Sequence, residues 1–148
     1  MSPLKRHPSL TPLSRFHRSA LFVAFVCKKG APEVKGYPKT LSGKRDYALS
    51  FYRDRLKHHF AEEEEKLIPW VAKGNLKLAE LSKEIIEEHQ TLSELFKKID
   101  SSQGWEEALF EMAAFLEKHI RKEERVFFEL VQNELTEEEM LDLGKILG

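Results

Sequence analysis

The stretch from residue 105 to residue 130, WEEALFEMAAFLEKHIRKEERVFFEL, has a seam whose positions step alternately by four and three residues. The seam consists of Trp105, Leu109, Met112, Leu116, His119, Glu123, Val126 and Leu130. This spacing predicts the buried face of one helix in a bundle. His119 and Glu123 nevertheless stand one turn apart in the middle of it. Because burying an unpaired carboxylate costs several kcal/mol, the chain must supply something that compensates for them.

A second segment repeats the pattern. Its seam consists of Tyr52, Leu56, His59, Glu63, Leu67 and Trp70. The neighbouring pair His58 and Glu62 has the same spacing, but it shares its helix face with charged side chains. The periodicity therefore selects His59 with Glu63 as the inward pair.

The residues that typically start and end helices predict an all-α chain of five helices in one domain, residues 1–148. The helices are expected at about residues 12–29, 44–73, 76–100, 105–134 and 137–147. Thr11 followed by Pro12 and the capping box Thr136 to Glu139 mark two of the helix starts. Four long helices with short to moderate connections favour an up-down-up-down four-helix bundle. The short C-terminal fifth helix is expected to pack Met140, Leu141, Leu143 and Ile146 across its end.

Charge and cysteine content narrow the functional classes. The chain has 24 Lys and Arg against 25 Asp and Glu, which gives no electrostatic case for nucleic-acid binding. Its single cysteine, Cys27, excludes an internal disulfide and suits a reducing compartment, so a cytoplasmic location is predicted.

The first thirty-two residues have no acidic side chain and contain an apolar run from Ala20 to Cys27, as a targeting peptide would. No small-residue cleavage site follows, and the run is too short to span a bilayer. We therefore interpret the segment as the first helix of the bundle, with no membrane association. Cleavage would remove that helix together with His17.

Each of the four long helices places one histidine on its apolar face, namely His17, His59, His89 and His119. A lone histidine on such a face is usually a hydrogen-bonded core residue. Four of them together with two buried glutamates predict a metal site, because histidine and glutamate one turn apart point the same way. The donor types suit iron, manganese or zinc, and six donors are too many for one closed tetrahedral zinc. The six donors therefore favour a dinuclear centre, in which Glu63 and Glu123 each bridge the two ions.

A ferritin-like carboxylate-bridged bundle is the alternative with the same helix count. It needs Glu-x-x-His on two helices. The residues three positions before His59, His89 and His119 are Leu56, Ile86 and Leu116, so that motif is absent.

Four stretches together make the chain resemble the hemerythrin-like, or HHE cation-binding, domain family over nearly its whole length. They are HPSLTPLSRFHRSAL, HFAEEEEKLIPW, EEHQTLSEL and HIRKEERVFFEL. The resemblance implies two iron ions, bridged by carboxylates and an oxo or hydroxo group, with an open position for oxygen or another small diatomic. The metal ligands it implies are His17, His59, Glu63, His89, His119 and Glu123.

Two positions depart from the family pattern. Oxygen-carrying hemerythrins have a second histidine one turn before the one in the third helix, where this chain has Ile85. One iron would thus lack a nitrogen donor. Relatives with this kind of amino terminus tend to have an acidic residue just before the first histidine ligand, where this chain has Phe16. Support for the His17 ring is therefore expected to come from another residue. His7 and His58 are interpreted as surface histidines, and Glu62, Glu64, Glu65 and Glu124 as surface charges.

The leading hypothesis is a di-iron protein that binds oxygen, nitric oxide or peroxide for storage, sensing or detoxification, as a monomer or homodimer. The alternative is an iron-dependent oxidoreductase or peroxidase, or a protein that delivers iron for cluster repair. The open coordination implied by Ile85 favours that alternative. Whether the protein is an enzyme stays open at this stage.

Overall fold

The computed structural model describes residues 5–148, and every regular element among them is helical. The expected all-α class is therefore confirmed. The first helix is α1 (Thr11–Cys27), the third is α5 (Leu76–Ile99) and the fifth is α8 (Glu137–Leu147). The long second helix consists of α2 (Leu41–Phe51), η1 (Tyr52–Leu56), α3 (Lys57–Glu62), η2 (Glu63–Leu67) and α4 (Ile68–Val71). The long fourth helix consists of α6 (Trp105–Lys122), η3 (Glu123–Phe127) and α7 (Phe128–Glu134). The elements labelled η are π-helical turns within continuous helices.

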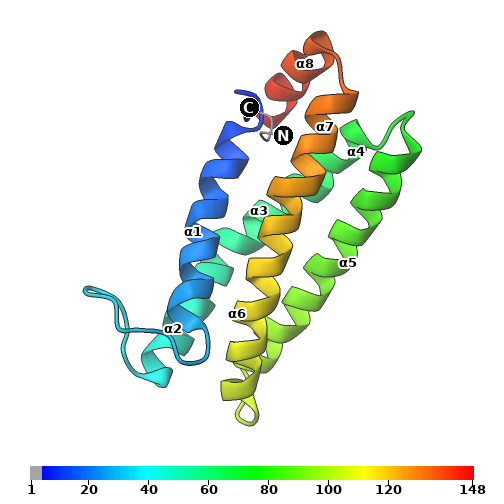
Figure 1. Cartoon of the computed structure of the whole chain (residues 1–148). Coiled ribbons are helices and arrows are strands. Elements are labelled where there is room, and N and C mark those ends of the chain that lie inside the picture. The colour runs from blue at the N-terminus through cyan, green and yellow to red at the C-terminus, as the bar shows by residue number, and fades with distance from the viewer. Residues whose placement is uncertain (1–4) are drawn as a thin grey trace.

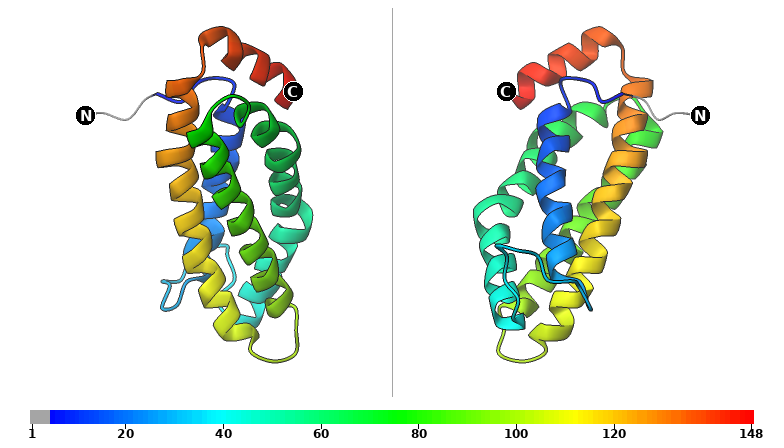
Figure 2. Two further views of the ribbon diagram at one scale, coloured as in Figure 1. Left: turned by 90° about the vertical axis from the view of Figure 1, so that its right-hand side faces the viewer. Right: turned by 60° about the vertical axis from the view of Figure 1, so that its left-hand side comes forward.

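The long helices lie along a common direction and form a helical bundle (Figure 1). Helix α6 packs against both α1 and α5, while α2 packs against α1. Helix α8 lies across one end of the bundle, beside the start of α1 (Figure 2). No helix within residues 5–148 has the length and apolarity needed to cross a membrane.

Side-chain caps explain where the second helix, α5 and α8 begin. The second helix starts three residues earlier than expected, because the Thr40 side chain accepts a hydrogen bond from the Gly43 N–H at 3.0 Å. The Asn75 side chain caps α5 through the Leu78 N–H at 2.9 Å. The capping box predicted for Thr136 and Glu139 is present at the start of α8.

The π-helical turn η3 shifts the buried face of the fourth helix. A π turn adds one residue to the helix, so the apolar stripe rotates after Glu123. Val126 is 50% exposed, whereas Phe127 and Phe128 are fully buried. The expectation that Val126 lies in the core was therefore wrong. Turn η2 has the same effect on the second helix, where Val71 is buried and the predicted seam residue Trp70 is only half-buried.

Two apolar clusters make up the core, one toward each end of the bundle. On α5, Ile85 belongs to one cluster and Leu92 to the other, and His89 lies between them. Met140 and Leu143 of α8 close one of the clusters, but Leu141 and Ile146 are exposed, which corrects the predicted face of α8. The histidines are thus positioned between two packed apolar layers.

Candidate metal centre

Six side chains from the four long helices meet between the two apolar clusters. They are His17, His59, Glu63, His89, His119 and Glu123, the same six residues that the sequence singled out. Each of them is at most 5% exposed. Their ligand atoms form two overlapping groups, and within each group all the atoms lie within 4.8 Å of one another. Both groups include Glu63 and Glu123.

The first group, called here the His17–His59 half, faces α1 and α3. The Nε2 atoms of His17 and His59 are 3.1 Å apart. Glu63 Oε2 lies 3.3 Å from His59 Nε2 and 3.7 Å from His17 Nε2. Glu123 Oε2 lies 3.1 Å from His17 Nε2. This half therefore gathers two imidazole nitrogens and one oxygen from each glutamate.

The second group, the His89–His119 half, uses the other oxygen of each glutamate. Glu63 Oε1 lies 3.1 Å from His89 Nε2. Glu123 Oε1 lies 2.9 Å from His119 Nε2 and 3.6 Å from His89 Nε2. Both halves have the same donor set, so the missing nitrogen expected from Ile85 does not distinguish one half from the other. Ile85 itself is fully buried among apolar side chains.

Three of the four histidines are held from behind by a carboxylate. The Nδ1 atom lies 2.6 Å from Glu124 Oε2 in His17, 2.7 Å from Glu64 Oε2 in His89 and 2.7 Å from Glu88 Oε1 in His119. A carboxylate at Nδ1 fixes the ring orientation and the tautomer, and leaves the Nε2 lone pair directed into the centre. The arrangement is that of histidines prepared to bind a metal ion.

The interpretation of Glu64 and Glu124 as solvated surface charges was therefore wrong. Each follows a buried glutamate by one residue, so it points to another side of the helix and reaches a histidine on a neighbouring helix. Glu88 was not singled out by the sequence, although it directly precedes His89. The signal that could have found all three is an acidic residue next to an inward-facing ligand. His7 and His58 lie outside both groups, as do Glu62 and Glu65.

Burial and charge pairing set the protonation of the centre. Burial lowers the pKa of His89 and of His119, but nearby carboxylates outweigh it. They are those of Glu123 and Glu63 for His89, and those of Glu123 and Glu88 for His119. The resulting pKa is about 10 for His89 and about 9 for His119. The pKa of His17 is raised well above its usual value for the same reason. Burial opposes ionisation of Glu123, yet the adjacent His119 holds its pKa well below the usual range.

The residues fit a pair of metal ions. Among residues 5–148, both carboxylate oxygens of Glu63 and of Glu123, with Nε2 of His89 and of His119, are buried without a hydrogen bond of acceptable geometry. Such groups are costly unless something binds them. Ligands about 2.1 Å from one ion lie roughly 3 to 3.5 Å from each other. The separations found here, 2.9 to 3.7 Å, match that spacing.

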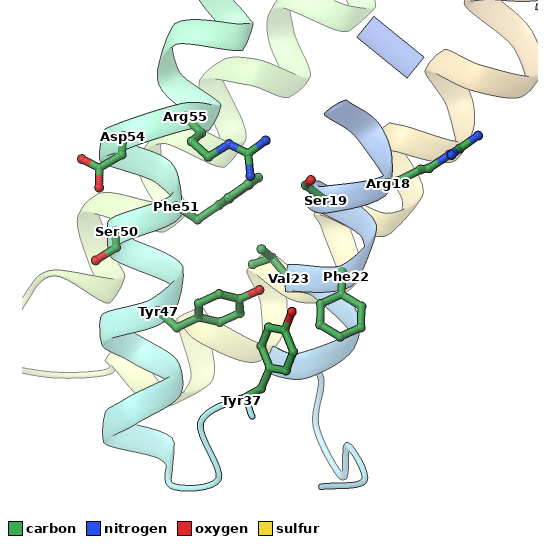
Figure 3. A pocket seen from close by; sticks show the side chains of 10 residues that line it. All are labelled: Arg18, Ser19, Phe22, Val23, Tyr37, Tyr47, Ser50, Phe51, Asp54 and Arg55. Carbon is green, nitrogen blue, oxygen red and sulfur yellow. The ribbon is translucent and has the colours of Figure 1, made fainter. Parts of the chain in front are cut away.

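Three cavities lie at or near the centre, and two of them reach a central histidine. A cavity of about 530 Å³ lies between α1 and α2 and is lined by Phe22, Tyr47 and Phe51 among others (Figure 3). None of the six central residues lines it. A smaller cavity of about 280 Å³ reaches His59 and shares Asp54 and Arg55 with the first. A third cavity, of about 320 Å³, reaches His119 and is lined by Glu88 and Lys122 among others. One histidine of each half, His59 and His119, is therefore approached by a cavity.

Comparison with known proteins agrees with this geometry. The model of the hemerythrin HHE cation-binding domain family matches residues 17–131, a span that includes all six central residues. Searches among curated proteins and among solved structures gave no match. The family match covers most of the chain, and the buried histidines and glutamates are placed for metal binding. The chain is a metal-binding protein and belongs to the hemerythrin HHE cation-binding domain family.

Proposed function

We propose that the protein binds two iron ions, one in each half of the centre, with His17, His59, His89 and His119 as terminal ligands and Glu63 and Glu123 as bridges. The observation that carries the proposal is the division of each glutamate's two oxygens between two pairs of histidines. A single ion would leave one oxygen of each glutamate, and two imidazoles, buried without a partner. Manganese or zinc would satisfy the same donors.

The proposed activity is binding of oxygen, nitric oxide or peroxide, for storage, sensing or detoxification. Two iron ions, when bound, supply reversible redox chemistry and open coordination positions. The chain's own contribution is to hold the ligands in place and to limit water access. The apolar clusters on both sides exclude water, and Glu64, Glu88 and Glu124 orient three of the imidazoles. An up-down-up-down order of the four long helices is part of this proposal, because it brings one histidine from each to the same level.

The test is elemental analysis of protein purified from iron-supplemented cells, together with an ultraviolet-visible spectrum. The proposal expects two irons per chain and near-ultraviolet bands that change when oxygen or nitric oxide is added to the reduced protein. One zinc or manganese per chain would contradict the dinuclear assignment. Glu65→Ala, which alters an exposed acid next to the centre, is the matched control and should keep both ions and the spectrum.

A second function is favoured by the cavity that reaches His59. It gives a small molecule, or an iron ion, a path to one half of the centre. An iron-dependent oxidoreductase or peroxidase, or an iron-delivery protein, would need such a path. Turnover of hydrogen peroxide by the iron-loaded protein, absent in Glu63→Ala, would support the enzyme. Binding of nitric oxide without peroxide turnover would support the binding protein.

A further inference from the structure

The centre has an internal twofold relationship that extends to the residues behind the ligands. Residues 59, 63 and 64 of the second helix correspond to residues 119, 123 and 124 of the fourth. His17 of α1 corresponds to His89 of α5. Under this relationship, the contact of His89 with Glu64 becomes the contact of His17 with Glu124, and both are observed, at 2.7 and 2.6 Å.

The third carboxylate contact has no counterpart. His119 is held by Glu88, the residue just before His89. The corresponding partner for His59 would be the residue just before His17, which is Phe16. Its ring stacks on the His59 ring with the centroids 4.1 Å apart and the planes at 20°. Phe16 thus covers His59, but it cannot accept a hydrogen bond from it.

The surrounding charges depart from the symmetry in the same way. Lys122 holds Glu88 at 2.7 Å, and the position corresponding to Lys122 is occupied by Glu62. A lysine there would have no carboxylate to hold. No hydrogen bond joins His59 Nδ1 to any side chain or backbone group that the structure describes, so only packing orients that imidazole from behind.

The small cavity opens on this same side of the centre. Phe16 and His59 both line it, as do Asp54, His58 and Glu62. Arg55 lines it as well, with its guanidinium 5.2 Å from the centre of the Phe16 ring, so the cavity has both acidic and basic side chains. A cavity of about 320 Å³ reaches His119 as well, and there Glu88 and Lys122 line it. Cavities therefore approach both halves, and the halves differ because a carboxylate holds His119 from behind whereas none holds His59.

We propose that the metal ion of the His17–His59 half is the exchangeable ion of the pair, that His59 is the ligand that releases it, and that Phe16 is the positioning residue responsible. The inference rests on the two-ion centre proposed above. Loss of the carboxylate behind a ligating histidine typically weakens metal affinity by about 10- to 100-fold. The ion in the His89–His119 half, with both of its imidazoles held from behind, should accordingly leave later.

The experiment measures how fast Fe²⁺ passes from the loaded, full-length protein to an excess of a chromogenic chelator under argon. Wild type is expected to release its two ions in two phases of equal amplitude, with rates that differ by about tenfold or more. The double variant Phe16→Glu with Glu62→Lys builds the missing pair, and it should slow the fast phase toward the slow one. Phe16→Leu with Glu62→Lys is its matched control and should leave the fast phase fast.

A second variant keeps the test decisive if the first does not fold. Glu88→Gln removes the carboxylate behind His119, and it should speed the slow phase about 10- to 100-fold until both ions leave together. Release of two ions in one phase by wild type, or a slow phase unchanged in Glu88→Gln, would overturn the inference and leave the two-ion centre intact. A wild-type protein that never loads two ions would instead contradict the proposed function itself.

Discussion

Glu63 and Glu123 stand on different helices and each divides its carboxylate in the same way. One oxygen of Glu63 faces His59 at 3.3 Å and the other faces His89 at 3.1 Å. One oxygen of Glu123 faces His17 at 3.1 Å and the other faces His119 at 2.9 Å. Each glutamate contributes one oxygen to each half of the centre, so both side chains link the two halves.

This sharing predicts that removing one glutamate affects both ions. Glu63→Ala should reduce the metal content from two ions per chain to well below one. Each half then loses one of its two carboxylate oxygens, so Glu123 alone must compensate the charge of both ions. Elemental analysis after desalting measures it. Retention of one full ion per chain would show that the halves are independent.

The carboxylates behind the histidines should matter nearly as much as the ligands. Glu124→Gln and Glu64→Gln keep the shape of the side chain but weaken its hydrogen bond to His17 and to His89. We expect each to lower metal affinity by about 10- to 100-fold. Competition with a chelator of known affinity measures the change, and Glu117→Gln is a surface control. Equal affinity in all three variants would assign Glu64 and Glu124 to the surface after all.

The raised histidine pKa values make the stability of the metal-free protein depend on pH. His89 and His119 have pKa values of about 10 and about 9 in the folded chain, against 6.5 when unfolded. The folded state therefore binds these protons more tightly, and the stabilisation is complete below pH 6.5 and is lost as pH rises through 9 to 10. Urea unfolding in a chelating buffer should show a lower midpoint at pH 9 than at pH 7. A midpoint that rises over this interval would contradict the charged state of these histidines.

The register shift at η3 predicts opposite outcomes for adjacent residues. Phe127→Ala should lower the free energy of unfolding by about 3–5 kcal/mol, because that side chain is fully buried. Val126→Ala should change it by about 0.5 kcal/mol or less, because Val126 is half exposed. Urea denaturation of both variants tests the shift. A larger loss of unfolding free energy in Val126→Ala than in Phe127→Ala would contradict the register shift.

The sequence was sufficient to predict the helical class and the six inward residues, because both depend on periodicity. His59 was chosen over His58 by its apolar neighbours, and the structure buries His59 while His58 is exposed. Periodicity failed beyond Glu123, since a π turn adds a residue that no local pattern in this chain announces. It also failed for Leu141 and Ile146, because a short helix lying across the end of a bundle buries a narrower face than a helix inside it.

The partners behind the histidines could not be predicted from one helix alone. Glu64 and Glu124 lie on the outer sides of their own helices and gain their role from a histidine on another helix. The sequence did show that Phe16 is unusual, but it assigned the missing support to His17. The structure gives His17 a partner in Glu124 and leaves His59 without one among the described residues, because the contact crosses between helices and only their relative position decides it.

The most direct test of the two-ion centre is anomalous diffraction from crystals of the iron-loaded protein, recorded at the iron absorption edge. The account predicts two peaks of similar height, one beside Nε2 of His17 and His59 and one beside Nε2 of His89 and His119, with Glu63 and Glu123 reaching both. A single peak shared by all six side chains, or two peaks elsewhere on the chain, would contradict it.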